Sequence, residues 1–216
     1  MDLSVKQLKQ ATEVRRAGLV AAALQLASQR SPADITTADL ARTVGITQGA
    51  VFRHFASKEA IWLSVVDWTT ETLLAHLHRA AVGTNEDQLS PLLALKAIFE
   101  AHVDFVMKHP GVPRVIFQEL QHTQDTPLKA RVRGLMLRYR TLVMEMLQRA
   151  KAQDLLAPGT DLQAASVLFL GAVQGLVLQA LFNGQVQSMT MQAPGVFSIY
   201  LRGITPEQIL PSVAHI

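Results

Sequence analysis

Cysteine is absent from this chain of 216 residues, which excludes disulfide bonds and thiolate metal sites. Charged residues are scarce at 17%, and none occurs between Asp161 and Arg202. Residues 1–10 hold no apolar run long enough for a signal peptide, so we expect a cytoplasmic protein. The apolar share of 49% is ample for a sizeable core.

Catalytic motifs are also missing. The chain has no glycine-rich phosphate loop and no nucleophile elbow. His76 and His78 are two residues apart, so on a helix they point in different directions and make a poor metal pair. We therefore predict a protein that is not an enzyme and that holds neither a metal nor a cofactor.

Positive charge is concentrated at one end of the chain. Residues 1–60 hold eight Lys/Arg and five Asp/Glu, whereas the remainder holds twelve of each sign. The net charge of +3 therefore belongs to the N-terminal segment. An excess of this sign would attract the phosphates of DNA.

Hydrophobic spacing indicates helices along the whole chain and shows no strand-period alternation, so the predicted fold is all-α. The first helix would carry an apolar stripe that includes Val14 and Ala17. Pro194 falls in the last apolar segment, so the last helix either begins near Pro194 or is kinked there. The predicted helices cover about 5–29, 37–44, 47–55, 58–81, 91–108, 112–121, 128–152, 162–182 and 189–201.

Residues 36–59 indicate two short helices joined by a tight turn. Thr37 is predicted to cap the first helix and Thr47 the second, because a threonine hydroxyl accepts hydrogen bonds from the first-turn N–H groups. Gly45 stands where the first helix must stop, and glycine adopts positive φ at little cost. Val51 and Phe55 are four residues apart and would face the core.

The opposite side of the second short helix is predicted to enter the DNA major groove. Gly49 and Ala50 make its N-terminal end slim, which suits insertion between the phosphate backbones. Arg53 is able to donate two hydrogen bonds to guanine, and Gln48 is able to address adenine. Lys58 would hold a phosphate at the next helix. The predicted DNA-binding residues are Thr37, Thr47, Gln48, Gly49, Ala50, Phe52, Arg53, His54 and Lys58.

This segment resembles the DNA-binding signature of the TetR family of transcriptional regulators, in specific terms over about residues 10–60. The family usually has tyrosine where this chain has Phe52, and that hydroxyl commonly reaches a phosphate, so one backbone contact would be missing here. The matching residues are Thr37, Leu40, Ala41, Gly45, Ile46, Gly49, Val51, Phe52, His54, Phe55, Ser57, Lys58 and Glu59.

The resemblance implies a three-helix, helix-turn-helix DNA-binding head at 1–60 and a helical ligand-binding and dimerisation domain at 61–216. The charge-free run at 162–182 is long enough to span a membrane, but it contains four polar residues, and no second span accompanies it. A helix that pairs with its twofold mate fits it better. The predicted dimer contacts are Val167, Leu168, Gly171, Gln174, Gly175 and Leu178.

The resemblance also implies a cavity between the head and the dimer helices. Its mainly apolar and aromatic lining would suit a mainly apolar small ligand. Packing a core requires the same residue types, so this expectation rests on helix faces alone. The predicted ligand-binding residues are Trp62, Phe99, His102, Val103, Phe117, Tyr139 and Phe169.

We therefore expect a homodimeric DNA-binding regulator, a repressor that binds an inverted-repeat operator and is released by a small molecule. One alternative is an architectural or chromosome-organising DNA-binding protein without an effector. Another is an all-α enzyme or ligand carrier that has lost DNA binding. The second alternative would leave Gly45, Arg53 and Lys58 without a shared purpose.

Overall fold

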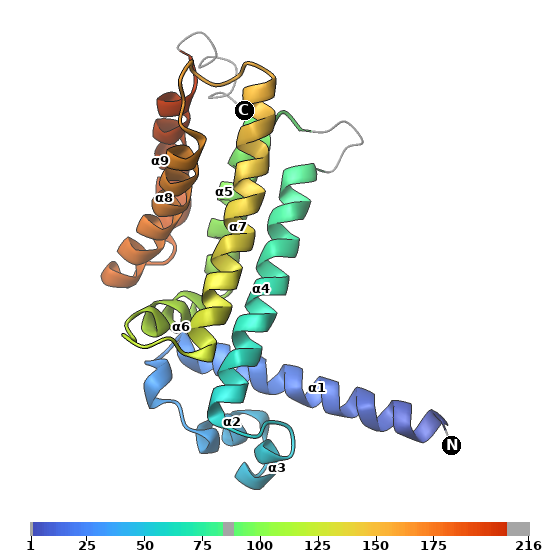
Figure 1. The fold of residues 1–216 in the computed structure, drawn as a ribbon. Coiled ribbons are helices and arrows are strands. Elements are labelled where there is room, and N and C mark those ends of the chain that lie inside the picture. The colour runs from blue at the N-terminus through green and yellow to red at the C-terminus, as the bar shows by residue number, and fades with distance from the viewer. Residues whose placement is uncertain (1, 84–88, 207–216) are drawn as a thin grey trace. The chain divides into compact units, whose positions relative to one another are not determined.

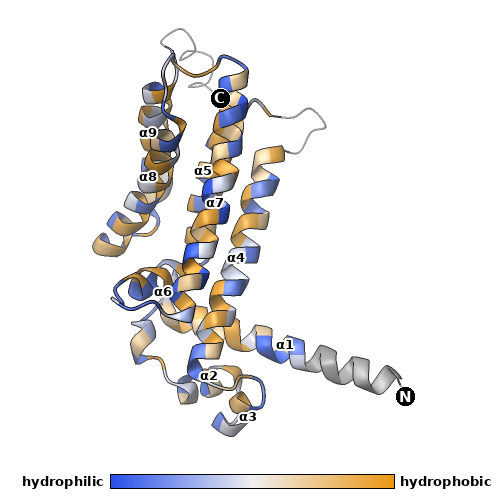
Figure 2. Cartoon of the chain, viewed as in Figure 1, coloured by the Kyte–Doolittle hydropathy of each residue, from blue (hydrophilic) through white to orange (hydrophobic). Residues whose placement is uncertain are grey.

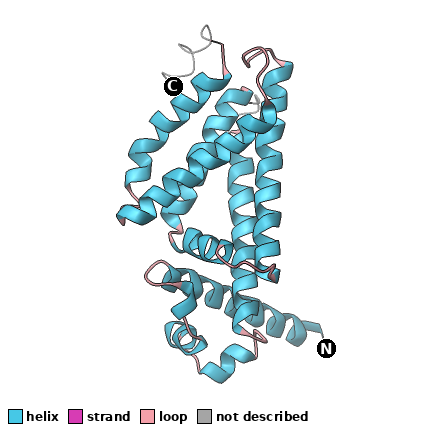
Figure 3. Ribbon diagram, turned by 60° about the vertical axis from the view of Figure 1, so that its left-hand side comes forward, coloured by secondary structure: helices cyan, strands magenta, loops and turns pink. Residues whose placement is uncertain are grey.

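The computed structural model describes residues 2–83 and 89–206, with the side chains of the first helix described from Thr12 onward. Within these residues the fold is all-α, as predicted, and helices are joined by loops without any strand (Figure 3). The loop predicted at 83–90 and the tail predicted after Gly203 lie partly outside the described residues.

The observed helix bounds follow the predicted ones closely, with one exception. The second short helix ends earlier than predicted. The elements are α1 Asp2–Ala27, the 3-10 helix η1 Pro32–Asp34, α2 Thr37–Val44, α3 Gln48–Phe52, α4 Lys58–Val82, α5 Pro91–Lys108, α6 Gly111–Leu120, α7 Pro127–Ala152, α8 Leu162–Asn183 and α9 Ser188–Ile204 (Figure 1).

The first of two compact units comprises Met1–Glu71 and His109–Arg133. In it, α1 packs against both α2 and α6. The buried part of α1 begins at Leu19, so the prediction that Val14 and Ala17 belong to the apolar stripe is wrong. Helix α6 approaches α1 so closely that a Cβ atom on Gly111 would lie 2.1 Å from the carbonyl oxygen of Leu24. This position therefore tolerates only glycine.

The second unit comprises Thr72–Lys108 and Gly134–Ile216, in which α9 packs against α5 and α8. Helix α8 begins after Asp161, whose Oδ1 accepts from the N–H groups of Gln163 and Ala164, and it ends at Gly184 with φ of 65°. Hydrophobic residues recur along both α8 and α9 (Figure 2). The units are defined by contacts, so the predicted functional boundary at residue 60 stays a prediction.

Pro194 lies inside α9, six residues after its first residue, so of the two predicted alternatives the structure excludes a helix that begins near Pro194. Proline in a helix interior removes one i→i−4 hydrogen bond and costs about 3 kcal/mol. Six side chains of α9 are buried, two before Pro194 and four after it, and their packing stabilises the helix despite this cost. These side chains are Met189, Ala193, Phe197, Tyr200, Leu201 and Ile204.

Candidate DNA-binding site

Helix α2 begins with a complete capping box. The hydroxyl of Thr36 accepts from the N–H of Asp39 at 3.1 Å, and the Asp39 carboxylate accepts from the N–H of Thr36 at 3.0 Å. The prediction that Thr37 caps this helix is therefore wrong by one residue. Both threonines carry a suitable hydroxyl, and the carboxylate three residues after Thr36 decides between them. Thr37 is instead the first helical residue.

Asp39 is the electrostatic centre of this corner. Its carboxylate lies 2.7 Å from the guanidinium of Arg30 and 3.4 Å from that of Arg42. The hydrogen bonds from Thr36, together with the charge of Arg30, lower the pKa of Asp39 to about 2. Asp39 is therefore ionised at neutral pH, and it ties the turn that follows α1 to the first turn of α2.

The turn between α2 and α3 has the predicted form. Gly45 adopts φ of 71°, and its N–H reaches the carbonyls of Ala41 and Arg42. No atom lies within 4 Å of a Cβ built on Gly45, so glycine is needed here for its backbone conformation rather than for space. Ile46, predicted to enter the core, is half-buried.

Helix α3 is capped by Thr47, whose hydroxyl accepts from the N–H of Ala50 at 3.2 Å, as predicted. The helix was predicted to continue to Phe55 but ends at Phe52, with Arg53 as its C-cap. The prediction that Val51 and Phe55 face the core is confirmed, since both are buried. The guanidinium carbon of Arg16 lies 4.7 Å from the centre of the Phe55 ring, so α1 also packs on this residue.

The outward side of α3, here called the reading face, consists of Gln48, Gly49, Phe52 and Arg53, all exposed. A Cβ atom on Gly49 would meet none of the described atoms within 4 Å, so no contact with residues 2–83 or 89–206 requires glycine there. Within the described residues, the guanidinium of Arg53 has no hydrogen-bond or ion-pair partner. These two residues are thus open to a partner outside the chain.

Gln48 is oriented by α2. Its Nε2 donates to the hydroxyl of Thr37 at 2.9 Å, which leaves the side-chain carbonyl and one N–H free for a base edge. Ala50 and His54 are half-buried, and His54 Nδ1 is shielded from solvent without a hydrogen-bond partner. Of the predicted DNA-binding residues, these two are the least accessible.

Lys58, the last of the predicted DNA-binding residues, lies at the start of α4. Ser57 accepts from the N–H of Ala60 at 3.1 Å, and the Lys58 ammonium donates to the carbonyl of Ala33 at 3.0 Å. Sequence reasoning missed Gln118 of α6, whose Oε1 accepts from the N–H of Ala33 at 3.1 Å. No local signal points to Gln118, because it lies 85 residues from its partner.

Comparison with known proteins identifies this arrangement. Residues 19–65, which contain α2, α3 and the turn between them, match the family described as bacterial regulatory proteins, tetR family. The chain belongs to the TetR family. It is accordingly a DNA-binding transcriptional regulator with a helix-turn-helix head, and members of this family are not enzymes.

The relatives of this TetR-family chain include nucleoid occlusion factors. It is 25% identical over 157 residues to SlmA of Vibrio cholerae, covering 73% of this chain and 78% of that protein. It is 31% identical over 132 residues to SlmA of Haemophilus ducreyi, covering 59% and 63%. Both proteins carry the name nucleoid occlusion factor.

Solved structures share the fold over nearly the whole chain. The ketosteroid transcriptional regulator KstR2 of Mycobacterium tuberculosis matches with a TM-score of 0.72 at 21% identity, over 89% of this chain and 96% of that one. FadR from Bacillus subtilis in complex with stearoyl-CoA matches with a TM-score of 0.75 at 15% identity, over 87% and 98%. At these identities the likeness concerns the fold alone.

Four of the seven predicted ligand-binding residues of this TetR-family chain meet in the second unit. Phe169 lies at the centre, with its ring 5.5 Å from Phe99, 6.5 Å from Tyr139 and 5.4 Å from Tyr200. Val103 is buried on α5, whereas Trp62 and Phe117 belong to the first unit. The group of rings is called the aromatic cluster below and consists of Phe99, His102, Tyr139, Phe169, Phe197 and Tyr200.

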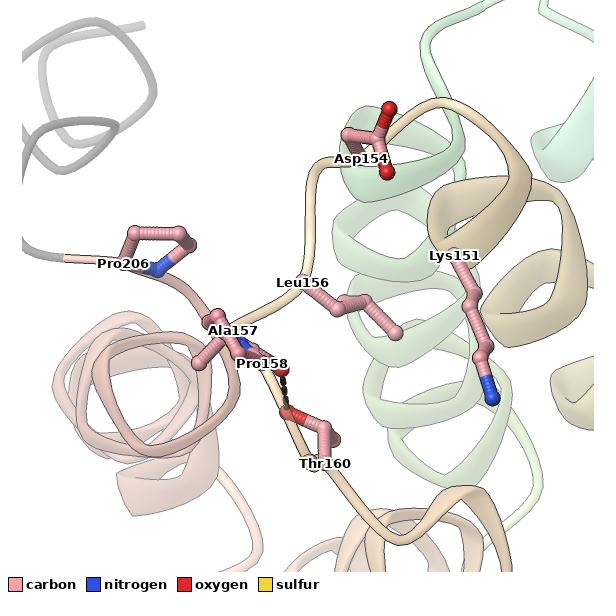
Figure 4. Close-up of a pocket in the computed structure, with 8 residues that line it drawn as sticks. Lys151, Asp154, Leu156, Ala157, Pro158, Thr160 and Pro206 are labelled. Carbon is pink, nitrogen blue, oxygen red and sulfur yellow. Dashed lines mark hydrogen bonds between the residues drawn. The ribbon is translucent and has the colours of Figure 1, made fainter.

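A pocket of about 470 Å³ lies elsewhere in the second unit, beside the loop between α7 and α8 (Figure 4). Its charged residues, Lys151 and Asp154, point away from one another, and the Thr160 hydroxyl is bonded to the carbonyl of Ala157 at 2.7 Å. None of the predicted ligand-binding residues lines it. Its polar groups do not converge on one point, so it lacks the character of a specific site.

Helix α8 exposes the residues predicted for dimerisation. Val167, Leu168 and Leu178 are 57%, 55% and 41% exposed, and Gly171 and Gly175 have open space around a built Cβ. The opposite side of α8 is buried, so it is a partly buried helix of the second unit rather than a membrane span. Sequence reasoning missed three further exposed apolar residues, Phe182 on α8 and Met191 and Ile199 on α9.

Proposed function

We propose that this regulator is a homodimeric, cytoplasmic repressor that binds an inverted-repeat operator and leaves it when a small molecule binds the second unit. The single observation that carries the DNA part is the reading face. Among the described residues, nothing contacts a Cβ at Gly49 and nothing pairs with the Arg53 guanidinium, yet both suit a major groove, one by its small size and the other by its donors.

The exposed apolar side of α8 and α9 supports the dimer. An isolated soluble chain seldom leaves side chains such as Phe182, at 77% exposed, and Met191, at 87%, in water on adjoining helices. The small residues Gly171 and Gly175 would let a second helix approach closely. Twofold symmetry would then present two reading faces and require two half-sites in the operator.

The aromatic cluster supports an effector. Rings from α5, α7, α8 and α9 meet there, so a ligand among them would contact four helices at once. KstR2 is named a ketosteroid regulator and FadR was solved with stearoyl-CoA, and both share this fold. Release requires only that the ligand bind one dimer arrangement more tightly than the other.

A second candidate is favoured by the relatives named nucleoid occlusion factors. In that role the protein would bind many chromosomal sites and organise or guard the nucleoid, with no effector required. The reading face and the α8 face would serve either role. The two candidates differ in how many sites are bound and in whether binding responds to a small molecule.

Selection of bound sequences from random duplex DNA, followed by mapping of bound sites on the native chromosome, tests both candidates. A repressor gives an enriched inverted repeat at a few promoters, whereas an occlusion-type protein gives a repeat at many dispersed sites. Arg53→Ala should cost about 1–3 kcal/mol of operator binding and relax one base position. Binding without enrichment, lost steeply as salt rises, would contradict both sequence-specific roles.

A further inference from the structure

Two buried hydroxyl groups in the second unit have no hydrogen-bond partner within residues 72–83, 89–108 and 134–206, the part of that unit that the structure describes. Ser166 on α8 is 0% exposed, and Tyr200 on α9 is 3% exposed. Neither Ser166 Oγ nor Tyr200 Oη is paired. Thr205 shows the ordinary arrangement, since its buried hydroxyl donates to the carbonyl of Leu201 at 2.9 Å. Unpaired buried hydroxyls are uncommon because each forfeits its hydrogen bonds to water.

Both hydroxyls belong to the surroundings of the aromatic cluster. Ser166 lies three residues before Phe169 on α8, so the two side chains are neighbours on one helix face. The Phe169 ring contacts that of Tyr200 at 5.4 Å, and Tyr200 also contacts Phe197 at 5.9 Å. The Tyr200 hydroxyl therefore belongs to the aromatic cluster itself, and the Ser166 hydroxyl lies one helical turn from its central ring.

The other polar groups of the cluster are already paired with each other. His102 Nδ1 lies 3.1 Å from the Tyr139 hydroxyl. Desolvation lowers the pKa of His102 to about 4, and burial raises the pKa of both Tyr139 and Tyr200 well above the usual value. All three are neutral at pH 7. Ser166 and Tyr200 thus remain as the groups that a ligand would satisfy.

No charged side chain is buried among the described residues of the second unit, where Ser166, Thr205, Tyr139 and Tyr200 carry buried hydroxyls. An anionic or cationic ligand would lose its hydration there without gaining a counter-charge, which is costly. An uncharged ligand with an oxygen that hydrogen bonds to a hydroxyl avoids that cost.

We propose that the effector of this regulator is an uncharged ring compound whose hydroxyl or carbonyl oxygen hydrogen bonds to Ser166 and Tyr200. The ring replaces or stacks on members of the aromatic cluster, and the oxygen satisfies the two hydroxyls. This inference rests on the proposed release of the repressor by a small molecule and names the chemical class of that molecule.

The premise is tested without any ligand, by thermal unfolding of three variants. Tyr139→Phe removes a paired hydroxyl and should lower Tm by about 2–4 °C. Tyr200→Phe and Ser166→Ala remove unpaired hydroxyls and should leave Tm unchanged or raise it, because no hydrogen bond is lost. If both lower Tm as much as Tyr139→Phe does, the hydroxyls are paired and the proposal fails.

The ligand class is tested with three probes built on one ring system: 2-naphthol, naphthalene and 2-naphthoate, titrated calorimetrically at pH 7. We expect 2-naphthol to bind about tenfold more tightly than naphthalene, as one added hydrogen bond would give, and 2-naphthoate to bind most weakly. Ser166→Ala and Tyr200→Phe should remove the advantage of 2-naphthol while leaving naphthalene binding unchanged. Equal binding of naphthol and naphthalene, tighter binding of naphthoate, or no binding of any probe would overturn the proposal.

Failure of this inference is distinguishable from failure of the proposed function. A parent protein that selects no DNA sequence contradicts the repressor role, whatever the probes do. A parent protein that selects an operator while its Ser166→Ala and Tyr200→Phe variants bind the probes as the parent does contradicts the ligand class alone.

Discussion

The Lys58 ammonium donates a hydrogen bond to the main-chain carbonyl of Ala33 across 3.0 Å, which joins the first turn of α4 to the corner between α1 and α2. The N–H group of Ala33 donates to Gln118 of α6 at 3.1 Å. Both backbone polar groups of one residue are thus held by side chains from other helices of the first unit. This corner precedes α2 directly, so the two bonds help fix where the helix-turn-helix begins.

Replacement of Lys58 by alanine separates two roles of this side chain. If the ammonium also reaches a phosphate, affinity should fall for all DNA sequences alike, and the slope of log K against log salt should flatten by about 1. If Lys58 only holds Ala33, affinity falls but the slope stays the same. Binding titrations at several salt concentrations decide, with Lys58→Arg as the control that retains the charge.

Gln118→Leu should weaken the contact between α6 and Ala33, the residue that Lys58 also holds. The substitution removes the Gln118 Oε1 acceptor from the Ala33 N–H and from the Ser31 hydroxyl, which lies 3.3 Å from it. The Ala33 N–H then keeps only its longer bond to Ser31 Oγ, at 3.3 Å. We expect a loss of about 0.5–1.5 kcal/mol in unfolding free energy and faster hydrogen exchange of the Ala33 amide. Gln118→Glu keeps an acceptor and should restore slow exchange. Equal exchange in all three proteins would show that α6 does not hold the corner.

Gly49→Ala should stabilise the folded chain and weaken DNA binding. Alanine at this open helical position would stabilise the chain by up to about 1 kcal/mol. The added methyl group would point at the groove floor and should weaken operator binding by about tenfold. Gly134→Ala is the matched control, since Gly134 is an exposed glycine of α7 with equally open space. An unchanged operator affinity in Gly49→Ala would show that Gly49 does not lie against the floor of the major groove.

Leu168→Glu should produce monomers. A carboxylate at this exposed position of α8 would be buried unpaired in the proposed interface, which neither partner could satisfy. Sedimentation equilibrium should show the monomer mass, and operator affinity should fall with it. Leu137→Glu is the control, because Leu137 is 67% exposed on α7 and lies outside the proposed interface. A dimeric Leu168→Glu protein would rule out this face.

The stability of the protein should decrease between pH 6.5 and pH 4 because of His102. Its pKa is lowered from 6.5 to about 4 in the folded chain, so the unfolded chain binds more protons in this window. Neutral His102 contributes roughly 3 kcal/mol to the free energy of unfolding. This contribution is fully present above pH 6.5 and is lost as the pH falls through 4. Denaturant unfolding of the parent and His102→Asn measures it. Parallel pH profiles would show that His102 is hydrated.

The sequence was sufficient to predict the helix cap and the turn of the helix-turn-helix. Thr47 and Gly45 act within their own turn, so residue type and spacing were enough to predict a cap and a positive φ. The same reasoning placed the cap of α2 on Thr37 instead of Thr36, because the deciding partner is a side chain three residues further on. Packing also overrode propensity at Pro194, which α9 contains in its interior.

The sequence by itself determined the all-α fold, the reading face and the charge-free helix α8, because helical periodicity and charge are properties of neighbouring residues. Only the tertiary structure decided that Gln118 and Lys58 hold one residue of the α1–α2 corner. It alone joined Phe99, Tyr139 and Phe169 and left Ser166 and Tyr200 unpaired beside them. These relationships join residues that are distant in the chain, and the packing of side chains, which no local pattern encodes, sets the distances between them.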